Sequence, residues 1–385
     1  IMTNAEKALA LHDEWKGKFE TTPKMSITTR EDLALAYTPG VAEPCKVIAK
    51  DKDAAYTYTI KSNTIAVVSD GSAVLGLGNI GAHAAMPVME GKAVLFKSFG
   101  GVNAVPICLD TQDTEEIIKT VVNIAPAFGG INLEDISAPR CFEIEERLKK
   151  ILDIPVFHDD QHGTAIVVLA GIINGLKVTG KNKEDCKVVV NGAGSAGVAI
   201  TKLLLTYGFK NITMCDKSGI LSKTSEGLNW MQKSMMDVTN LEGKTGTLAD
   251  ALKGADVFVG VSAPNIVTPE MVASMNKDSI LFAMANPVPE IMPDAAKAAG
   301  ARVVGTGRSD FPNQVNNDIA FPGIFKGALE GRAKQITEDM KLAAALAIAN
   351  LIPDSELSDT NILPEAFDPK VTDAVCKAVM DHIEK

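Results

Sequence analysis

The chain has 385 residues, 46% hydrophobic and 22% charged, which is typical of a globular protein and long enough for two domains. Its formal net charge of −10 argues against nucleic acid or an anionic membrane surface as the main partner. The six cysteines form no CxxC pair, so we expect reduced thiols in a cytoplasmic protein. The first residues lack an apolar signal core, and the longest apolar run, 164–176, is too short to span a bilayer.

The first 160 residues predict an α/β region that begins with helical patterning. The apolar run 33–37 leads into Thr38-Pro39-Gly40, a turn sequence that leaves Tyr37 at the end of a helix or short strand. Asp70-Gly71 predicts a tight turn between two strands. The predicted elements are a helix over 5–19, strands over 64–68, 73–75, 102–109, 128–133 and 155–157, a helix after residue 81 followed by a strand-like core segment at 91–96, and a helix over 114–124.

From residue 164 onward, short apolar strands alternate with helical segments, a pattern that indicates a doubly wound parallel sheet. The predicted strands are 187–190, 211–216, 256–261, 279–284 and 302–305, the helices are 164–176 and 197–207, the stretch 217–246 is irregular, and the last 55 residues are helical. We therefore predict an α/β fold of two domains, 1–160 and 161–340, the second a Rossmann-like doubly wound parallel sheet, followed by C-terminal helices (341–385).

Two GxGxxG motifs occur in the chain, and they have different contexts. The second spans Gly192, Ala193, Gly194, Ser195, Ala196 and Gly197. It follows an apolar strand and opens an apolar helix, and Asp216 ends the next strand. This spacing matches a dinucleotide fingerprint, with diphosphate at the helix N-terminus and an acid for the ribose hydroxyls. The first motif begins at Gly76 and lacks an acid at that distance, so we expect a loop that lines the active site.

Three carboxylates, Glu134, Asp135 and Asp160, follow short apolar runs. All-oxygen clusters of this kind select hard cations such as Mg²⁺ or Mn²⁺. His158 and His162 flank Asp159 at a spacing similar to that of zinc hydrolases, which is the alternative interpretation. It is disfavoured because the acid is Asp rather than Glu and no third ligand follows.

Lys92 follows a glycine and precedes the apolar run 93–96. It is either a surface side chain whose stem packs on apolar neighbours or a partly desolvated amine whose lowered pKa suits a base. On local evidence, Tyr37 is more often a packed aromatic side chain than a catalyst.

Taken together, several motifs of this chain resemble the malic enzyme family. They are 37–42, 69–71, 76–81, 90–92, 132–136, 158–164, 286–287 and 316–323. The resemblance extends from about residue 20 to 340, and the length is similar to that of the compact bacterial form. It implies oxidative decarboxylation of malate to pyruvate and CO₂ by a homodimer, with reduction of NAD or NADP and with Mg²⁺ or Mn²⁺.

The resemblance also implies roles for individual residues. Lys92 matches the general base for the malate C2 hydroxyl, and Tyr37 matches the acid that protonates C3 of enolpyruvate. The matched metal ligands are Glu134, Asp135 and Asp160, with Asp159 supporting Lys92. Residues expected to bind substrate or nicotinamide are Gly76, Ser262, Asn286, Asn316 and Asn317. Both Ser262 and Asn286 follow strands at the edge where open α/β sheets bind ligands.

Two features bear on specificity. Larger family members carry an arginine for a substrate carboxylate where this chain has Ser72 and Ala73, so we expect the first glycine loop and the asparagines to bind that carboxylate. Asp216 favours NAD, because its charge repels the extra phosphate of NADP and only Lys217 is nearby to offset it. Two alternatives are a malolactic enzyme, which retains NAD and releases lactate, and a non-enzymatic nucleotide-binding regulator, which needs no acidic cluster.

Overall fold

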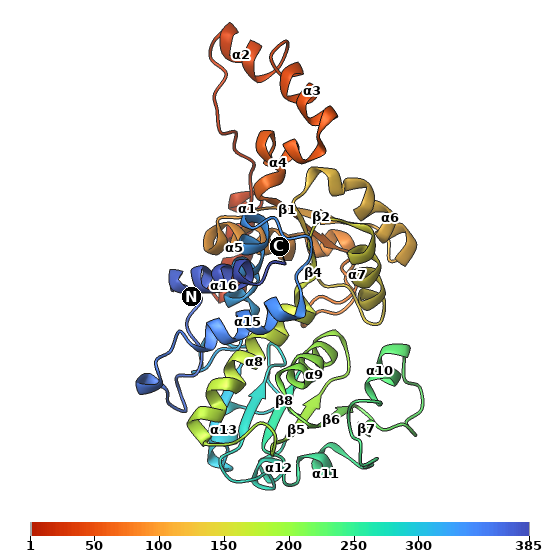
Figure 1. The fold of residues 1–385 in the computed structure, drawn as a ribbon. Coiled ribbons are helices and arrows are strands. Elements are labelled where there is room, and N and C mark those ends of the chain that lie inside the picture. The colour runs from red at the N-terminus through yellow and green to blue at the C-terminus, as the bar shows by residue number, and fades with distance from the viewer. Residues whose placement is uncertain (1, 385) are drawn as a thin grey trace.

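The computed structural model, which describes residues 2–384, contains two β-sheets covered by helices (Figure 1). The first sheet is parallel throughout, in the order β2-β1-β3-β4, and the second has the order β10-β9-β8-β5-β6-β7, with only β7 antiparallel to its neighbour. These sheets confirm the predicted α/β fold. The strands are β1 (Thr64–Ser69), β2 (Asn103–Cys108), β3 (Gly130–Leu133), β4 (Val156–His158), β5 (Lys187–Asn191), β6 (Asn211–Asp216), β7 (Gly219–Ile220), β8 (Val257–Gly260), β9 (Ile280–Ala283) and β10 (Val303–Thr306).

The helices cover both sheets and form an additional N-terminal arm. The α-helices are α1 (Asn4–Trp15), α2 (Arg30–Ala36), α3 (Ala42–Lys50), α4 (Ala55–Tyr58), α5 (Gly81–Gly100), α6 (Thr114–Ile124), α7 (Arg140–Ile151), α8 (Asp159–Thr179), α9 (Ser195–Tyr207), α10 (Trp230–Met235), α11 (Leu248–Leu252), α12 (Pro269–Ala273), α13 (Pro293–Ala298), α14 (Phe321–Glu330), α15 (Glu338–Ala349) and α16 (Pro369–Asp381). Short 3₁₀ helices are η1 (Lys52–Ala54), η2 (Ile60–Asn63), η3 (Ala125–Ala127), η4 (Asn317–Ile319) and η5 (Asp354–Glu356).

Alternating side chains of β1 enter two different cores. Ile65 and Val67 pack in the core shared with α5, whereas Ala66 and Val68 pack in the core shared with α6 and α7. All strands of this sheet run parallel, so the carboxyl ends of β1, β3 and β4 lie at one edge. The residues that follow these strands are therefore brought together.

The second sheet also separates two cores. Its β5, β8 and β9 side chains pack alternately with α8 and α9 on one face and with α11, α12 and α13 on the other. The chain leaves β5 for β6 on one side and later adds β8 on the other. This reversal is a topological switch point, where open α/β sheets bind ligands beyond the carboxyl ends of their strands.

Helix α8 connects the two sheets, since it starts directly after β4 and its apolar side chains pack in the core of the second sheet. It begins at Asp159, five residues before the predicted start at 164, because its first turn is polar. By length and composition α8 could cross a membrane, but 72% of its apolar window is buried inside the protein. We therefore interpret it as a core helix.

Two predicted strands are absent from the described residues. Residues 73–75 form part of a loop closed by a single bridge between Val74 and Gly78, and 91–96 lie within α5. Pro87 and Gly91 interrupt the helical pattern in the sequence. Burial of Met89, Ala93 and Phe96, which are spaced along one helix face, outweighs that local preference.

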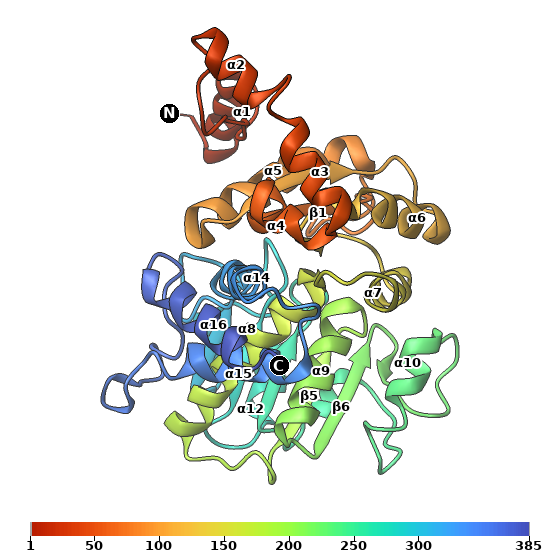
Figure 2. The same cartoon turned by 45° about the horizontal axis from the view of Figure 1, so that its top comes forward.

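The N-terminal arm comprises residues 20–50 and includes α2 and α3, which project from the first sheet and its helices (Figures 1 and 2). Neither helix contains a buried residue. Large apolar side chains of the arm are nevertheless exposed, namely Met25, Ile27, Leu33, Leu35, Tyr37 and Val47. The arm therefore presents apolar side chains that the rest of the described chain covers only in part.

The C-terminal helices pack back onto the body of the protein. Helix α15 lies against α8, and α16 lies against α14 and α15. The stretch 217–246, predicted to be irregular, also contains β7 and α10. The predicted domain boundaries at 160 and 340 remain predictions.

Candidate active site

The carboxylates of Glu134, Asp135 and Asp160 converge at the carboxyl edge of the first sheet. One ligand-type oxygen from each lies within 4.8 Å of the other two. Asp160 Oδ2 also accepts a 2.7 Å hydrogen bond from the backbone N–H of Asp135. Asp135 adopts a positive φ of 55°, an uncommon conformation for a residue other than glycine, and such strain is often found at functional sites. The structure thus brings together the three predicted metal ligands.

This cluster holds more negative charge than the surrounding protein neutralises. Burial and the neighbouring Asp160 carboxylate raise the pKa of Asp135 to about 8, and burial raises the pKa of Glu134 well above its ordinary value. Asp135 Oδ2 is buried without a hydrogen-bond partner in the protein. Buried oxygen atoms in excess of their hydrogen-bond donors are suited to a hard divalent cation, so the donor set fits Mg²⁺ or Mn²⁺.

Lys92 is 8% exposed and lies beside the acidic cluster. Its Nζ is 2.6 Å from Asp159 Oδ2 and 3.1 Å from Glu134 Oε1, and it lies 4.0 Å from the centroid of the Phe321 ring. Burial lowers the pKa of Lys92, but the two carboxylates outweigh burial and raise it. The expectation of a lowered pKa was therefore wrong for this arrangement, because the sequence does not show how closely two carboxylates approach the amine.

Asp159 is fully buried at the start of α8 and orients two neighbours. Its Oδ2 accepts hydrogen bonds from Lys92 and from Asn317 Nδ2. A Cβ at Gly163 would collide with Asp159 Oδ1, so the glycine of this motif leaves room for the carboxylate. Burial raises the pKa of Asp159 to about 6.

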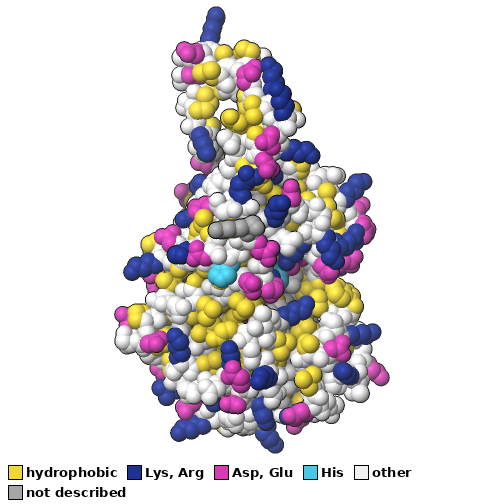
Figure 3. All heavy atoms as spheres, viewed as in Figure 1, with side chains coloured by type: hydrophobic (Ala, Val, Ile, Leu, Met, Phe, Trp, Pro, Cys, Tyr) yellow, Lys and Arg dark blue, Asp and Glu magenta, His cyan; other side chains and the backbone are white. Residues whose placement is uncertain are grey.

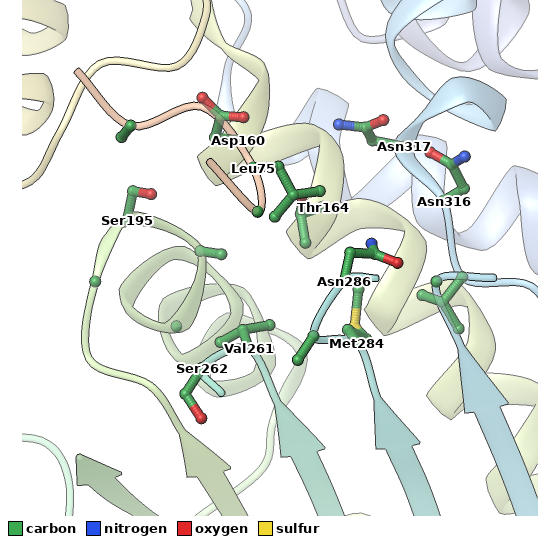
Figure 4. A pocket seen from close by; sticks show the side chains of 18 of the residues that line it. Leu75, Asp160, Thr164, Ser195, Val261, Ser262, Met284, Asn286, Asn316 and Asn317 are labelled. Carbon is green, nitrogen blue, oxygen red and sulfur yellow. The ribbon is translucent and has the colours of Figure 1, made fainter. Parts of the chain in front are cut away.

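A cavity of about 670 Å³ extends from this cluster to the carboxyl edge of the second sheet. Figure 4 shows that its residues come from both halves of the molecule, with Asp160 and Leu75 facing Ser195, Ser262 and Asn286. Gly76 lies on a loop that lines this cavity, as expected for the first glycine motif. The predicted residues that line the cavity are Gly76, Asp135, Asp160, Gly194, Ser195, Ala196, Gly197, Ser262, Asn286, Asn316 and Asn317.

The glycines of the second motif have the close contacts that a dinucleotide fingerprint requires. Gly192 has φ 120°, and a Cβ there would lie 2.7 Å from the Val261 carbonyl oxygen. A Cβ at Gly197 would collide with the Gly192 carbonyl. Helix α9 begins at Ser195, so its free backbone N–H groups point into the cavity where a diphosphate would bind.

Asp216 lies at the end of β6, as predicted. Its Oδ1 accepts hydrogen bonds from the Ser218 N–H at 2.8 Å and the Ser218 hydroxyl at 2.5 Å. Its other carboxylate oxygen accepts no hydrogen bond from residues 2–384. Lys217 is exposed and forms no ion pair among the described residues.

Tyr37 lies outside this assembly. It is 66% exposed at the end of α2, on the N-terminal arm, and it is not among the residues that line the cavity. Lys92 does not line the cavity either, but it is buried against the acidic cluster, with its amine 3.1 Å from Glu134 Oε1. The structure of a single chain therefore does not bring the two predicted proton-transfer residues together.

The structure also shows the surroundings of Ser72 and Ala73, the positions that lack an arginine for the substrate carboxylate. Ala73 lines the cavity, and within residues 2–384 the cavity wall contains no lysine or arginine. Arg140 binds the turn that contains Asp70 and Ser72, since its Nη2 lies 2.9 Å from Asp70 Oδ2 and 3.0 Å from Ser72 Oγ. The amides that line the cavity are Asn286, Asn316 and Asn317, which agrees with the expectation of neutral donors.

Sequence reasoning missed several residues around the site. Glu290 is fully buried and accepts hydrogen bonds from the backbone N–H groups of Ser262 and Ala285, and so fixes two cavity-lining loops to each other. Burial raises the pKa of Asp318, which neighbours Asn317, to about 6. Asp318 and Phe321 lie within the family-like motif 316–323, whereas no spacing rule identifies Glu290.

Comparisons with known proteins give concordant matches along the chain. Residues 16–149 match the family model for the malic enzyme N-terminal domain, and residues 161–383 match the model for the malic enzyme NAD-binding domain. A bifunctional malic/malolactic enzyme from Bacillus subtilis is 58% identical, covering 98% of this chain and 92% of the relative. An NAD-dependent malic enzyme from Geobacillus stearothermophilus is 59% identical, over 95% of this chain and 76% of that protein.

A crystal structure of an NAD-dependent malic enzyme from Thermotoga maritima superposes with a TM-score of 0.94 at 52% identity, covering 97% of this chain and 98% of that one. Relatives at 46% to 47% identity, including one from Halomonas elongata, are named NADP-dependent malic enzymes.

Proposed function

The chain belongs to the malic enzyme family, and from that premise we propose that it oxidises and decarboxylates malate to pyruvate and CO₂ while reducing NAD. The observation that carries this proposal is a cavity that Asp135 and Asp160 line at one end and the dinucleotide motif lines at the other. Glu134 completes the acidic cluster, and the Lys92 amine lies 3.1 Å from Glu134. Such a cavity can hold a small hydroxy acid between a proton acceptor and a hydride acceptor.

Glu134, Asp135 and Asp160 would hold the divalent cation, Mg²⁺ or Mn²⁺. When bound, the cation polarises the keto oxygen formed by oxidation, so that the β-carboxylate can leave as CO₂. The support for this assignment is the unpartnered Asp135 oxygen and the uncompensated charge of the cluster.

Lys92 takes the proton of the malate C2 hydroxyl at its Nζ. To do so it must first release its own proton, and Asp159, 2.6 Å away, is the adjacent acceptor. Once Glu134 serves as a metal ligand, it supports the charge of Lys92 less, and burial then favours the neutral amine. Asn317 holds Asp159 in place for this exchange.

The active unit is a homodimer in which the partner subunit's Tyr37 protonates enolpyruvate at C3. Two observations support this arrangement. The apolar face of the N-terminal arm is exposed and needs a partner, and Tyr37 is exposed away from the Lys92 of its own chain. A second copy that covers the arm would satisfy both observations at once. We place this enzyme in the cytoplasm.

We infer that NAD is the preferred cofactor, which when bound would supply the acceptor for the hydride of malate C2. Asp216 has a carboxylate oxygen available for the ribose hydroxyls, and an added phosphate at that position would be repelled. The Geobacillus stearothermophilus relative at 59% identity supports NAD, whereas the relatives named as NADP-dependent, such as that of Halomonas elongata at 46%, support the alternative.

Malolactic activity is the second candidate, favoured by the bifunctional name of the Bacillus subtilis relative. The two reactions are separated by incubating the protein with malate, NAD⁺ and Mn²⁺ while following both absorbance at 340 nm and lactate. We expect NADH and pyruvate to accumulate in equal amounts. Lactate without NADH would replace the proposal with the malolactic reaction, and absence of both products would overturn it.

A further inference from the structure

A second cavity, of about 600 Å³, lies on the opposite side of the first turn of α8 from the active site. It is enclosed by α7, α8, α9, α10 and α15, which meet on the face shown in Figure 3, where yellow hydrophobic and dark blue basic side chains lie side by side between α7 and α10. The function proposed above does not use this cavity.

Amines from three helices line this second cavity. They are Lys149 of α7, Lys202 of α9 and Lys341 of α15. Lys341 is 2% exposed, and burial lowers its pKa, whereas Lys202 is exposed at the edge of the cavity. Lys202 forms no ion pair or side-chain hydrogen bond among residues 2–384. Lys149 and Lys341 have carboxylate partners, so among the described residues Lys202 is the one of these three amines without such a partner.

The carboxylates near these lysines are already engaged. Glu145 Oε1 lies within hydrogen-bond distance of His162 and Lys149, and Glu338 accepts a 2.7 Å hydrogen bond from Lys341. The third carboxylate that lines the cavity, Glu146, forms an ion pair with Lys150 at 2.8 Å. Lys202 is therefore the amine available to an incoming anion, with Lys149 and Lys341 beside it.

The rest of the cavity wall is largely apolar. Phe142, Leu203, Met231, Met235 and Val238 line it. A cavity with cationic groups along an apolar wall suits an organic anion with an apolar body, since the wall removes that body from water while the amines bind the charge.

A continuous series of buried contacts leads from this cavity to the acidic cluster. Lys341 Nζ donates to His162 Nδ1 at 3.1 Å, and His162 Nε2 is 2.6 Å from Glu145 Oε1. The other oxygen of Glu145 accepts the backbone N–H of His158 at 2.7 Å. The side chain of the same residue continues the series: His158 Nε2 lies 2.9 Å from Oδ2 of Asp160, a predicted metal ligand, as a close polar contact outside hydrogen-bond geometry.

We propose that this second cavity is an effector site for a small organic anion with an apolar body, and that its occupancy changes the cation affinity of the acidic cluster through Glu145 and His158. An anion that draws Lys149 or Lys341 toward itself alters the contacts of Glu145 and His162, which position the start of α8. The coupling half of the proposal rests on the proposed metal site, whereas the binding half does not.

Binding is tested by calorimetry with phenyl phosphate on metal-free protein in EDTA, with the dinucleotide site saturated by NADH. We expect a Kd on the order of 1 mM, and inorganic phosphate, which lacks the apolar body, should bind about tenfold more weakly. Lys202→Glu should weaken phenyl phosphate binding by about tenfold or more, because it places a carboxylate at the anion position. Lys253→Glu, an exposed change on the same domain, is the matched control and should bind as wild type.

Absence of binding at roughly 20 mM phenyl phosphate, or equal binding by wild type and Lys202→Glu, would overturn the site whether or not the proposed catalytic function is correct. A loss of the same size in Lys253→Glu would do so as well.

Coupling is tested by measuring free Mn²⁺ by electron paramagnetic resonance with and without saturating phenyl phosphate. We expect the Mn²⁺ Kd to change about threefold or more, and Mn²⁺ must change the phenyl phosphate Kd by the same factor. Lys202→Glu should bind Mn²⁺ as wild type and show no response to phenyl phosphate. An unchanged Mn²⁺ Kd in wild type that does bind phenyl phosphate would rule out an effector role.

Discussion

Lys92 and Tyr37, to which the family resemblance assigns the two proton transfers, lie in opposite environments. Lys92 is buried on a long core helix, where Asp159 and Glu134 hold its amine within 3.1 Å. Tyr37 is exposed on the projecting arm, at the end of a helix without a buried residue. One half of the chemistry is thus preorganised inside the chain. The other half is presented outward, as expected of a residue that acts in a neighbouring subunit.

The largest effect should come from the preorganised half. Glu134→Gln, Asp135→Asn and Asp160→Asn should each lower kcat/KM by roughly a thousandfold, because each removes a carboxylate that would serve as a charged ligand of the divalent cation. Glu143→Gln, an exposed change on α7, is the control. The measurements are steady-state kinetics and Mn²⁺ affinity. Near-normal turnover at low Mn²⁺ in any one variant would remove that residue from the ligand set.

The comparison between Lys92 and Tyr37 is tested most directly with mixed dimers. Lys92→Ala and Tyr37→Phe should each be nearly inactive alone. If Tyr37 acts in the partner subunit, unfolding and refolding the two variants together at equal amounts should restore about a quarter of wild-type activity, because half of the dimers are mixed and each has one intact site.

The outcome of mixing separates the two arrangements. If Tyr37 acts on the Lys92 of its own chain, every site in a mixed dimer lacks one residue and no activity returns. Wild type mixed with each variant under the same conditions measures the loss from refolding itself.

The sequence predicts the position of the acidic cluster better than it predicts the pKa of Lys92. Strand ends are determined by local patterns, so the sequence alone places Glu134, Asp135, Asp160 and the glycine motif at the carboxyl edges of the sheets. The direction of the pKa shift of Lys92 could not be predicted from local patterns, because this pKa depends on the carboxylates of residues 134 and 159, which are distant from Lys92 in the sequence. The site needs these long-range contacts, and no local propensity encodes them.

Tyr37 shows a second kind of limit. Its motif is recognisable, and its place at the end of a helix agrees with the sequence pattern, but the chain alone does not bring it to the site. The error for 91–96 has a related origin, since the burial of one face of α5 outweighs the local signals of Pro87 and Gly91. Local patterns predicted elements well where burial agreed with them.

A smaller effect should follow from changing Asp216, the proposed cofactor selector at the end of β6. Asp216→Ser should move the ratio of kcat/KM for NAD over NADP toward NADP by about tenfold, because it removes the charge that repels the added phosphate. Kinetics with both cofactors at saturating malate and Mn²⁺ measure this ratio. A wild-type preference for NADP, or an unchanged ratio in the variant, would show that Asp216 is not the selector.

The smallest effect should be on the free energy of unfolding, at a residue that lies at the opposite end of the second sheet from the candidate active site. Asp256 is at the amino end of β8, where its carboxylate accepts hydrogen bonds from the Lys187 N–H, Lys181 and Asn276. Burial opposes ionisation of Asp256, but these three donors outweigh it and lower its pKa below the ordinary 3.8. A lowered folded-state pKa stabilises the protein above pH 3.8, and that contribution is lost as the pH falls through the folded-state value.

Asp256→Asn should therefore lower the free energy of unfolding by about 1 kcal/mol at pH 7, with the difference shrinking below about pH 4. Urea denaturation at several pH values measures this difference, and malate oxidation at pH 7 should be unchanged. A destabilisation that grows as the pH falls would mean that the ionised carboxylate is not the stabilising form. A loss of activity in the folded variant would mean that the amino end of this sheet is coupled to the site at its carboxyl edge.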